Sequence, residues 1–131
     1  MLKTLRHAGL AVTLGVAVMG LSGCFAILAG AAAGAAGYAW VQGALIKEFN
    51  VSAVQLHEAT VKGLQAMDLE LTQDEYDRLS ARMISKFADG KDVRINIDAL
   101  TERTSKIKIR VGVFGDKMRS EMIYNSIQKN I

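Results

Sequence analysis

The chain has 131 residues, with 16 Lys and Arg against 13 Asp and Glu and a net charge of +3, which suits one small domain. The single cysteine, Cys24, excludes an internal disulfide and a zinc site built on several thiolates. From Lys47 onward there are 14 bases and 13 acids, so the basic character of the chain does not indicate nucleic-acid binding.

The first 23 residues have the pattern of a secretory signal peptide. Lys3 and Arg6 make the first seven residues basic, and residues 8–20 form a run of 13 apolar and small side chains. This run is shorter than the roughly 20 residues that a helix needs to span a bilayer. Small residues follow it, as expected before a cleavage site, and we expect residues 1–23 to be removed.

The sequence Leu21-Ser22-Gly23-Cys24 resembles the lipobox of bacterial lipoproteins. The resemblance implies that a signal peptidase recognises Leu21, Ser22 and Gly23 and cuts before Cys24. It also implies a covalent diacylglycerol on the Cys24 sulfur and an N-acyl lipid on the new amino group. Each buried CH₂ of such chains contributes about 0.8 kcal/mol to membrane anchoring. In enterobacterial lipoproteins an Asp directly after the cysteine favours retention in the inner membrane. This chain has Phe25 there, so the resemblance implies the outer membrane, if the host has one, with the protein facing the periplasm.

Residues 24–37, which include the lipidated cysteine, are rich in Gly and Ala and are interpreted as a tether. Two alternatives remain open. Residues 25–46 are uncharged and long enough for a membrane helix, and Ala26, Gly30 and Gly34 recur at a spacing that permits close helix approach. A membrane-embedded oligomer formed through this glycine-zipper-like helix is therefore the second hypothesis. The low leucine content and Gln42 favour the tether, or a helix on the membrane surface.

Residues 38–131 are expected to form one small domain. Residues 38–49 are rich in aromatic, branched and long apolar side chains, which predicts a first strand with a bend at Gly43. Asn50 and Ser52 are candidate N-caps for a helix that ends near Met67. Residues 69–71 predict a short strand.

Residues 78–87 fit both a helix and a strand. A capping-box pattern at Thr72 and Glu75 favours a helix. If residues 88–90 form a three-residue hairpin loop, however, the numbers of facing residues sum to 178 and Met83 lies opposite Ile95. The same register places Lys86 opposite Asp92. Apolar residues then face apolar residues and opposite charges meet, so the register predicts a strand.

Strict alternation from residue 106 to residue 113 predicts a further half-buried strand, which Gly112 and Gly115 end. Asp116 is predicted to cap a terminal helix. The expected buried residues of that helix are Met118, Met122, Ile123, Ile127 and Ile131. The fold class predicted from these elements is α+β, with an antiparallel sheet of four to five strands packed on two helices.

Three segments of the mature region carry a second resemblance: residues 37–43 (GYAWVQG), residues 88–91 (ADGK) with Val93 and Ile95, and residues 109–116 (IRVGVFGD). The region resembles a family of small bacterial lipoproteins known only as a domain of unknown function. The resemblance implies a location and a fold and brings no activity. Cys24 is the only residue to which it assigns a role.

The sequence offers no convincing catalytic set, cofactor site or metal site, and we expect a protein that is not an enzyme. His57 is the only histidine after the signal peptide and is interpreted as a boundary residue of the first helix. Asp74, Glu75 and Asp77 lack the ligand spacing of a calcium loop and are interpreted as a solvated turn. Gly112-x-x-Gly115-Asp116 is interpreted as a strand end and helix cap rather than a phosphate loop.

The alternation of the strands places basic side chains on the outer sheet face, with Asp92 and Asp98 as partial partners. This face is a candidate surface for anionic head groups or an acidic envelope protein, although solvated antiparallel faces are normally charged. The expected function is a non-enzymatic structural or interaction module, anchored to the membrane by lipid and without a nucleic-acid partner. The candidate binding residues are Arg82, Lys86, Arg94, Lys106, Lys108 and Arg110.

Overall fold

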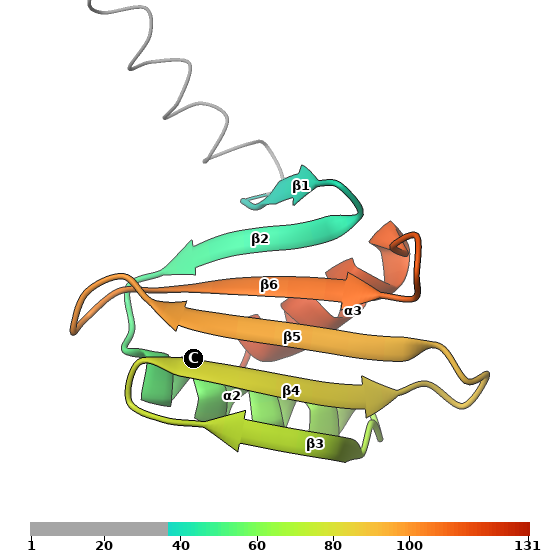
Figure 1. Ribbon diagram of the computed structural model, residues 1–131, viewed down its shortest axis with the longest axis horizontal. Helices are drawn as coiled ribbons and strands as arrows, with labels where there is room; N and C mark the ends of the chain where they lie inside the picture. The colour runs from blue at the N-terminus through green and yellow to red at the C-terminus, as the bar shows by residue number, and fades with distance from the viewer. Residues whose placement is uncertain (1–36) are drawn as a thin grey trace, which may run out of the picture.

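One antiparallel sheet of six strands, with two helices packed on one of its faces, makes up the part of the chain that the computed structural model describes, residues 37–131 (Figure 1). The strand order is β1-β2-β6-β5-β4-β3. The predicted α+β class is confirmed, while the strand count of four to five is too low. Neither helix in the described range is long and apolar enough to cross a membrane.

The single strand expected over residues 38–49 is a hairpin of β1 (Ala39–Val41) and β2 (Ala44–Phe49). Gln42 and Gly43 have φ values of 50° and 81°. Two consecutive left-handed residues form the turn that matches the twist of paired strands, so the chain reverses where only a bend was predicted. A helix over the whole of residues 25–46 is therefore wrong for its C-terminal part, and residues 25–36 lie outside the described range.

The first helix, α2 (Ala53–Ala66), begins and ends as predicted. The Ser52 side chain accepts a hydrogen bond from the Gln55 backbone, and the Gln55 side chain accepts one from the Ser52 backbone, which is a capping box. Met67 is the C-cap. The strand expected at residues 69–71 is instead β3 (Leu71–Tyr76). Because β3 pairs with β4, the pattern at Thr72 and Glu75 caps no helix.

The hairpin of β4 (Ser80–Lys86) and β5 (Asp92–Ala99) has the predicted register. Met83 pairs with Ile95, and Lys86 pairs with Asp92. The Lys86 amine lies 3.7 Å from the Asp92 carboxylate. The last strand, β6 (Ser105–Val111), lies between β5 and β2 and places Ile107 and Ile109 in the core.

The terminal helix, α3 (Lys117–Gln128), is capped by Asp116 as predicted, but its buried side differs. Ile123 and Ile127 are buried, together with Ser120 and Tyr124, which share the spacing of one helix face. Met118 and Met122 lie off this stripe and are 72 % and 51 % exposed, and Ile131 lies beyond the end of the helix. Their assignment to the buried side is wrong.

The core lies between the sheet and the two helices. Alternate residues of β4, β5 and β6 point into it, since side chains alternate across a strand, and they meet apolar residues of α2 and α3. The largest fully buried side chains are Leu45, Leu56, Leu64, Met83, Val93, Ile95, Ile97, Ile107, Ile109, Val111, Ile123 and Ile127.

The two helices approach most closely at Gly63 of α2. A Cβ atom built at Gly63 would lie 2.9 Å from the Ile127 backbone nitrogen, and the Ser126 hydroxyl donates to the Gly63 carbonyl at 2.7 Å. The missing side chain of Gly63 is therefore what lets α3 pack directly on α2.

Replacement of Gly63 by Ala should destabilise the domain, although alanine ordinarily favours a helix over glycine by about 1 kcal/mol. Overpacking costs typically about 1–3 kcal/mol and should outweigh that gain, because two of the three nearest atoms, the nitrogen and Cα of Ile127, belong to the backbone and cannot rotate away. Urea unfolding of the full chain measures the difference. The control is Gln65→Ala at an exposed position of the same helix, which should change stability by less than about 0.5 kcal/mol. A more stable Gly63→Ala variant would contradict this account.

Candidate functional site

The predicted lipidation site, Cys24, and its recognition residues, Leu21, Ser22 and Gly23, lie outside the described residues. The surface that the structure brings together is the outer face of the sheet, opposite the helices. All six predicted basic residues lie on it, because they alternate with core residues of β4, β5 and β6. They are Arg82, Lys86, Arg94, Lys106, Lys108 and Arg110.

The positive charges of this face are mostly without ionic partners. Lys86 is the one cation of the six with a carboxylate within 4.0 Å among the described residues. Arg94 pairs directly with Arg110 across β5 and β6, and like charges in this position repel each other. Arg110 donates to the carbonyl of Gln42 at 2.6 Å, which directs its guanidinium toward the β1–β2 turn. An anion near Arg94 and Arg110 would relieve their repulsion.

The charge on the outer face is uneven along the strands. Glu48 and Asp98 both pair with Lys106, and Glu75 pairs with Arg82, so the carboxylates gather toward one end. The other end, where β6 finishes, holds Arg94 and Arg110. Asp92 also lies at this end and pairs with Lys86, so Arg94 and Arg110 are the cations of the face that, in the described part of the chain, have no carboxylate partner beside the loop that joins β6 to α3.

That loop carries two exposed apolar side chains. Val113 is 83 % exposed and Phe114 is 93 % exposed. They border a hollow of about 630 Å³ whose other lining residues come from the β4–β5 turn and the basic end of the outer face, namely Asp89, Gly90, Lys91, Asp92, Arg94, Arg110 and Gly112. The prediction that Val113 belongs to the half-buried strand is wrong, because β6 ends at Val111. Two apolar residues between two glycines were the available signal for this exposed pair.

The backbone of the loop is packed against the turn between β1 and β2. A Cβ atom at Gly43 would lie 2.6 Å from the Phe114 carbonyl oxygen, and one at Gly115 would collide with the Gly43 backbone. Both glycines have positive φ, which other residues rarely adopt. The loop thus rests on the turn, while its apolar side chains point to solvent.

A set of ion pairs fixes the other side of the loop. Arg119 lies 2.7 Å from Asp89 in the β4–β5 turn and 3.6 Å from Asp116 at the start of α3, and Lys91 lies 3.4 Å from Asp116. The Arg119 guanidinium also lies over the Phe87 ring, 4.7 Å from its centre. Hydrogen bonding from Arg119 lowers the pKa of Asp89 from 3.8 to about 2.

The lowered pKa of Asp89 predicts a pH-dependent contribution to stability. The contribution is fully present above pH 3.8 and should be lost as the pH falls toward 2. The Asp89→Asn variant lacks it, so the difference in melting temperature between wild type and variant should close between pH 4 and pH 2. Thermal unfolding followed by circular dichroism measures this difference. A difference in melting temperature that stays constant down to pH 2 would exclude the Asp89–Arg119 contact as the source of that difference.

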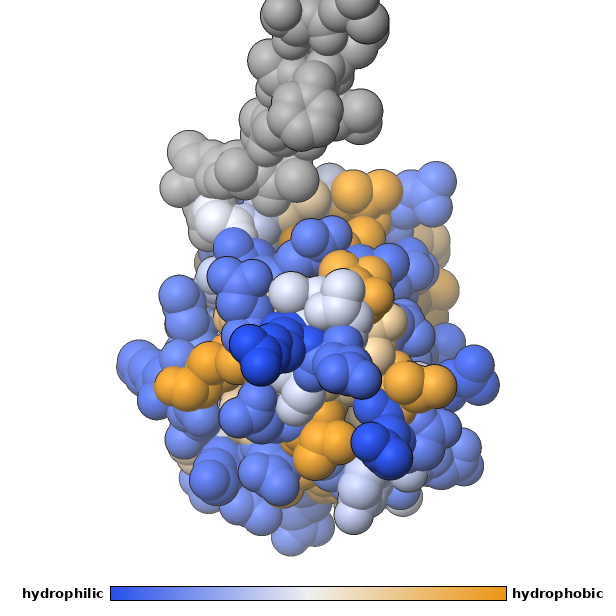
Figure 2. Space-filling view, turned by 90° about the vertical axis from the view of Figure 1, so that its left-hand side faces the viewer, coloured by the Kyte–Doolittle hydropathy of each residue, from blue (hydrophilic) through white to orange (hydrophobic). Residues whose placement is uncertain are grey.

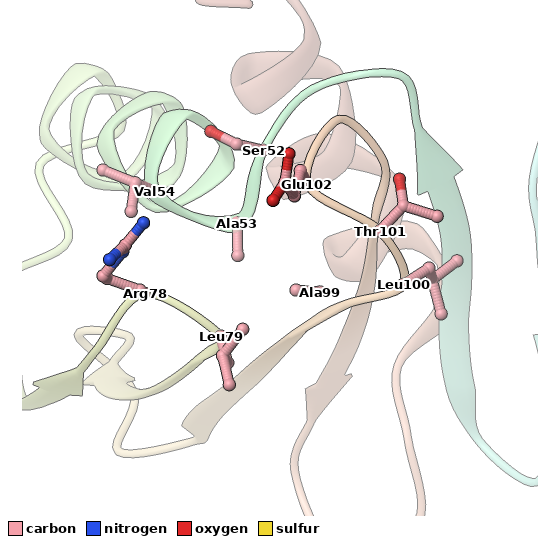
Figure 3. A pocket seen from close by; sticks show the side chains of 9 residues that line it. All are labelled: Ser52, Ala53, Val54, Arg78, Leu79, Ala99, Leu100, Thr101 and Glu102. Atoms are coloured by element: carbon pink, nitrogen blue, oxygen red, sulfur yellow. The ribbon is translucent and has the colours of Figure 1, made fainter.

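A second hollow, of about 750 Å³, lies at the opposite end, between the start of α2, the β3–β4 turn and the β5–β6 loop (Figure 3). Its hydroxyl groups already have partners: Ser52 caps α2, and Thr101 bonds Thr104 at 2.7 Å. Viewed from this end, the apolar side chains form separate islands among hydrophilic ones (Figure 2). Glu102 is the one carboxylate among the lining residues, and the hydrogen-bond partners of the two hydroxyls are other groups.

His57 lies under the sheet rather than at a boundary. It is 7 % exposed, its Nε2 donates to both Asp74 oxygens at 2.8 and 3.0 Å, and its ring stacks on Tyr76 at 4.1 Å. The predicted solvated turn is wrong for Asp74 and Glu75, which lie in β3, whereas Asp77 does lie in the β3–β4 turn and accepts from Leu79 and Ser80. These contacts connect α2 to β3. Across residues 37–131, no three His, Cys, Asp or Glu gather as a metal site would require.

The family model described as "Protein of unknown function (DUF3568)" matches residues 7–130, a range that includes Cys24, the Gly/Ala-rich segment and nearly all of the domain. No curated protein matches the chain.

Proposed function

We propose that this chain, which belongs to the DUF3568 family of proteins of unknown function, is a lipid-anchored lipoprotein of the cell envelope. Its α+β domain would face the periplasm, on the outer membrane, as a non-enzymatic structural or interaction module. The observation that carries the proposal is the sequence Leu21-Ser22-Gly23-Cys24, which follows an apolar run of signal-peptide length and contains the only cysteine of the chain.

The position of the domain relative to Cys24 supports the proposal. Gly37 lies thirteen positions after Cys24, and a fully extended chain of that length reaches at most about 45 Å. The entry of this segment into the domain is fixed by Tyr38, which is buried and donates a hydrogen bond to Glu121 of α3. That hydrogen bond raises the pKa of Tyr38 to about 12. A lipid on Cys24 would therefore keep the domain close to the membrane surface.

The chemistry of the outer face supports an interaction role. It offers six cations of which five have no ion-pair partner among residues 37–131, and it has no described group of side chains suited to covalent catalysis. Anionic head groups or an acidic envelope protein fit such a surface. The near balance of bases and acids from Lys47 onward gives no reason to propose a nucleic-acid partner.

The intact mass of the full chain, extracted from membranes, tests the anchor. Wild type should have lost residues 1–23 and gained the mass of two or three acyl chains, whereas the Cys24→Ala variant should stay uncut and unlipidated. Ser22→Ala, which keeps a small residue before the cleavage site, is the matched control and should be processed like wild type. A wild-type chain that keeps its N-terminus and carries no lipid would overturn the proposal.

An uncut wild-type chain without lipid would favour the alternative, a membrane-embedded oligomer formed through the small residues of the segment proposed as helix 25–46. The helix of this alternative would have to end before β1, because residues 39–41 and 44–49 are strands. Cross-linking in intact membranes distinguishes the two. Replacement of Gly30 and Gly34 by Leu should dissolve such an oligomer and should leave a lipid-anchored monomer unchanged.

A further inference from the structure

We propose that the loop between Gly112 and Gly115 is a membrane-contact element, which inserts Val113 and Phe114 at the interface of an anionic phospholipid bilayer. Arg94 and Arg110, beside the loop, would then bind the phosphates of the head groups, while Lys91, which is paired with Asp116, adds positive charge next to them. The inference rests on the proposed function in one respect: the lipid on Cys24 brings the domain to the membrane. The inference goes beyond the proposed function because it identifies the end of the domain that contacts the bilayer and the residues that make this contact.

The exposure of the two apolar side chains is the first argument. Val113 and Phe114 are adjacent in sequence and 83 % and 93 % exposed, so they expose more of their surface than any other large apolar residue of the described domain. An aromatic ring beside an aliphatic side chain is typical of segments that lie in the boundary between head groups and acyl chains. Met118, at the start of the following helix, is 72 % exposed.

The second argument is that the loop is held in this conformation. Gly43 and Gly115 bring two backbones into contact, and Asp116, at the foot of the loop, is bound by both Lys91 and Arg119. A loop fixed from two sides loses little conformational entropy when it binds. The loop is therefore held by contacts of its backbone and of Asp116, and the side chains of Val113 and Phe114 point outward.

Charge complementarity selects an anionic bilayer as the occupant. Lys91, Arg94 and Arg110 line the hollow that Val113 and Phe114 border, and Arg94 and Arg110 repel each other across their strands. The two carboxylates of the hollow have cations of their own: Asp89 pairs with Arg119 and Asp92 with Lys86. Phosphates at the head-group level would meet these cations while the apolar tip lies deeper.

The opposite end of the domain provides the contrast. Leu79 is 70 % exposed there, but the apolar side chains of that end are separated by hydrophilic ones (Figure 2). The carboxylates Glu48, Glu75 and Asp98 also lie toward that end of the outer face. Leu79 is thus a matched control: a large, exposed apolar residue in a turn, outside the basic end.

The test uses the full chain with its membrane anchor, reconstituted into vesicles. Val113→Cys and Leu79→Cys variants are labelled with a polarity-sensitive fluorophore, and quenching by aqueous acrylamide is compared in phosphatidylcholine vesicles with and without phosphatidylglycerol. With phosphatidylglycerol, the probe at residue 113 should be quenched about fivefold less than the probe at residue 79. Phe114→Ser and the pair Arg94→Gln and Arg110→Gln should each reduce that protection.

Equal quenching of the probes at residues 113 and 79 would overturn the inference. If both probes are accessible to acrylamide, the loop does not insert; if both are protected, the result reports only the affinity of the fluorophore for lipid. Protection at 113 that is the same without phosphatidylglycerol would overturn the assigned head-group contact. Circular dichroism of each variant shows that it is folded. The intact mass of the same preparation reports the lipid on Cys24 separately, so a failed loop contact and a failed anchor are distinguishable.

Discussion

Because β4, β5 and β6 place every second side chain under the helices, a shift of one residue in their register would exchange the apolar core with the charged outer face. The core formed by Ile95, Ile97, Ile107 and Ile109 therefore determines where the basic residues lie. The outer face is a consequence of how the inner face packs. Its unpaired arginines are tolerated because the free energy of the fold comes from the other side of the sheet.

Patterns that are local in sequence predicted much of this fold. The facing positions of β4 and β5, the alternation of β6, and the caps Ser52 and Asp116 all depend on residues close together in the chain. The errors came from tertiary structure. The β1–β2 reversal needs Gln42 in a left-handed conformation, which is uncommon for a residue other than glycine, and β3 is polar because it is an exposed edge strand paired only with β4.

The candidate site, like the fold, was predictable from the sequence only in part. Alternation alone predicted which cations share a face, since side-chain direction in a strand follows from position. It did not predict the contact of His57 with Asp74, which joins a helix to a strand. Nor did it predict the exposure of Phe114, which arises because the loop packs through backbone atoms at Gly43. Such contacts depend on how distant elements meet, and a single sequence carries little signal for them.

The short strand β1 has a mechanical consequence. A chain tethered upstream of Gly37 transmits any pull to the open end of the β1–β2 hairpin, where pairs of residues separate one at a time rather than together. β1 contributes only three such pairs, so by itself it would yield easily. Tyr38 stands directly before it, hydrogen-bonded to Glu121 and in edge contact with the ring of Tyr124. The force therefore reaches the terminal helix and the core through Tyr38 before it reaches β1. The contacts of Tyr38 thus protect the short β1–β2 hairpin from being pulled apart.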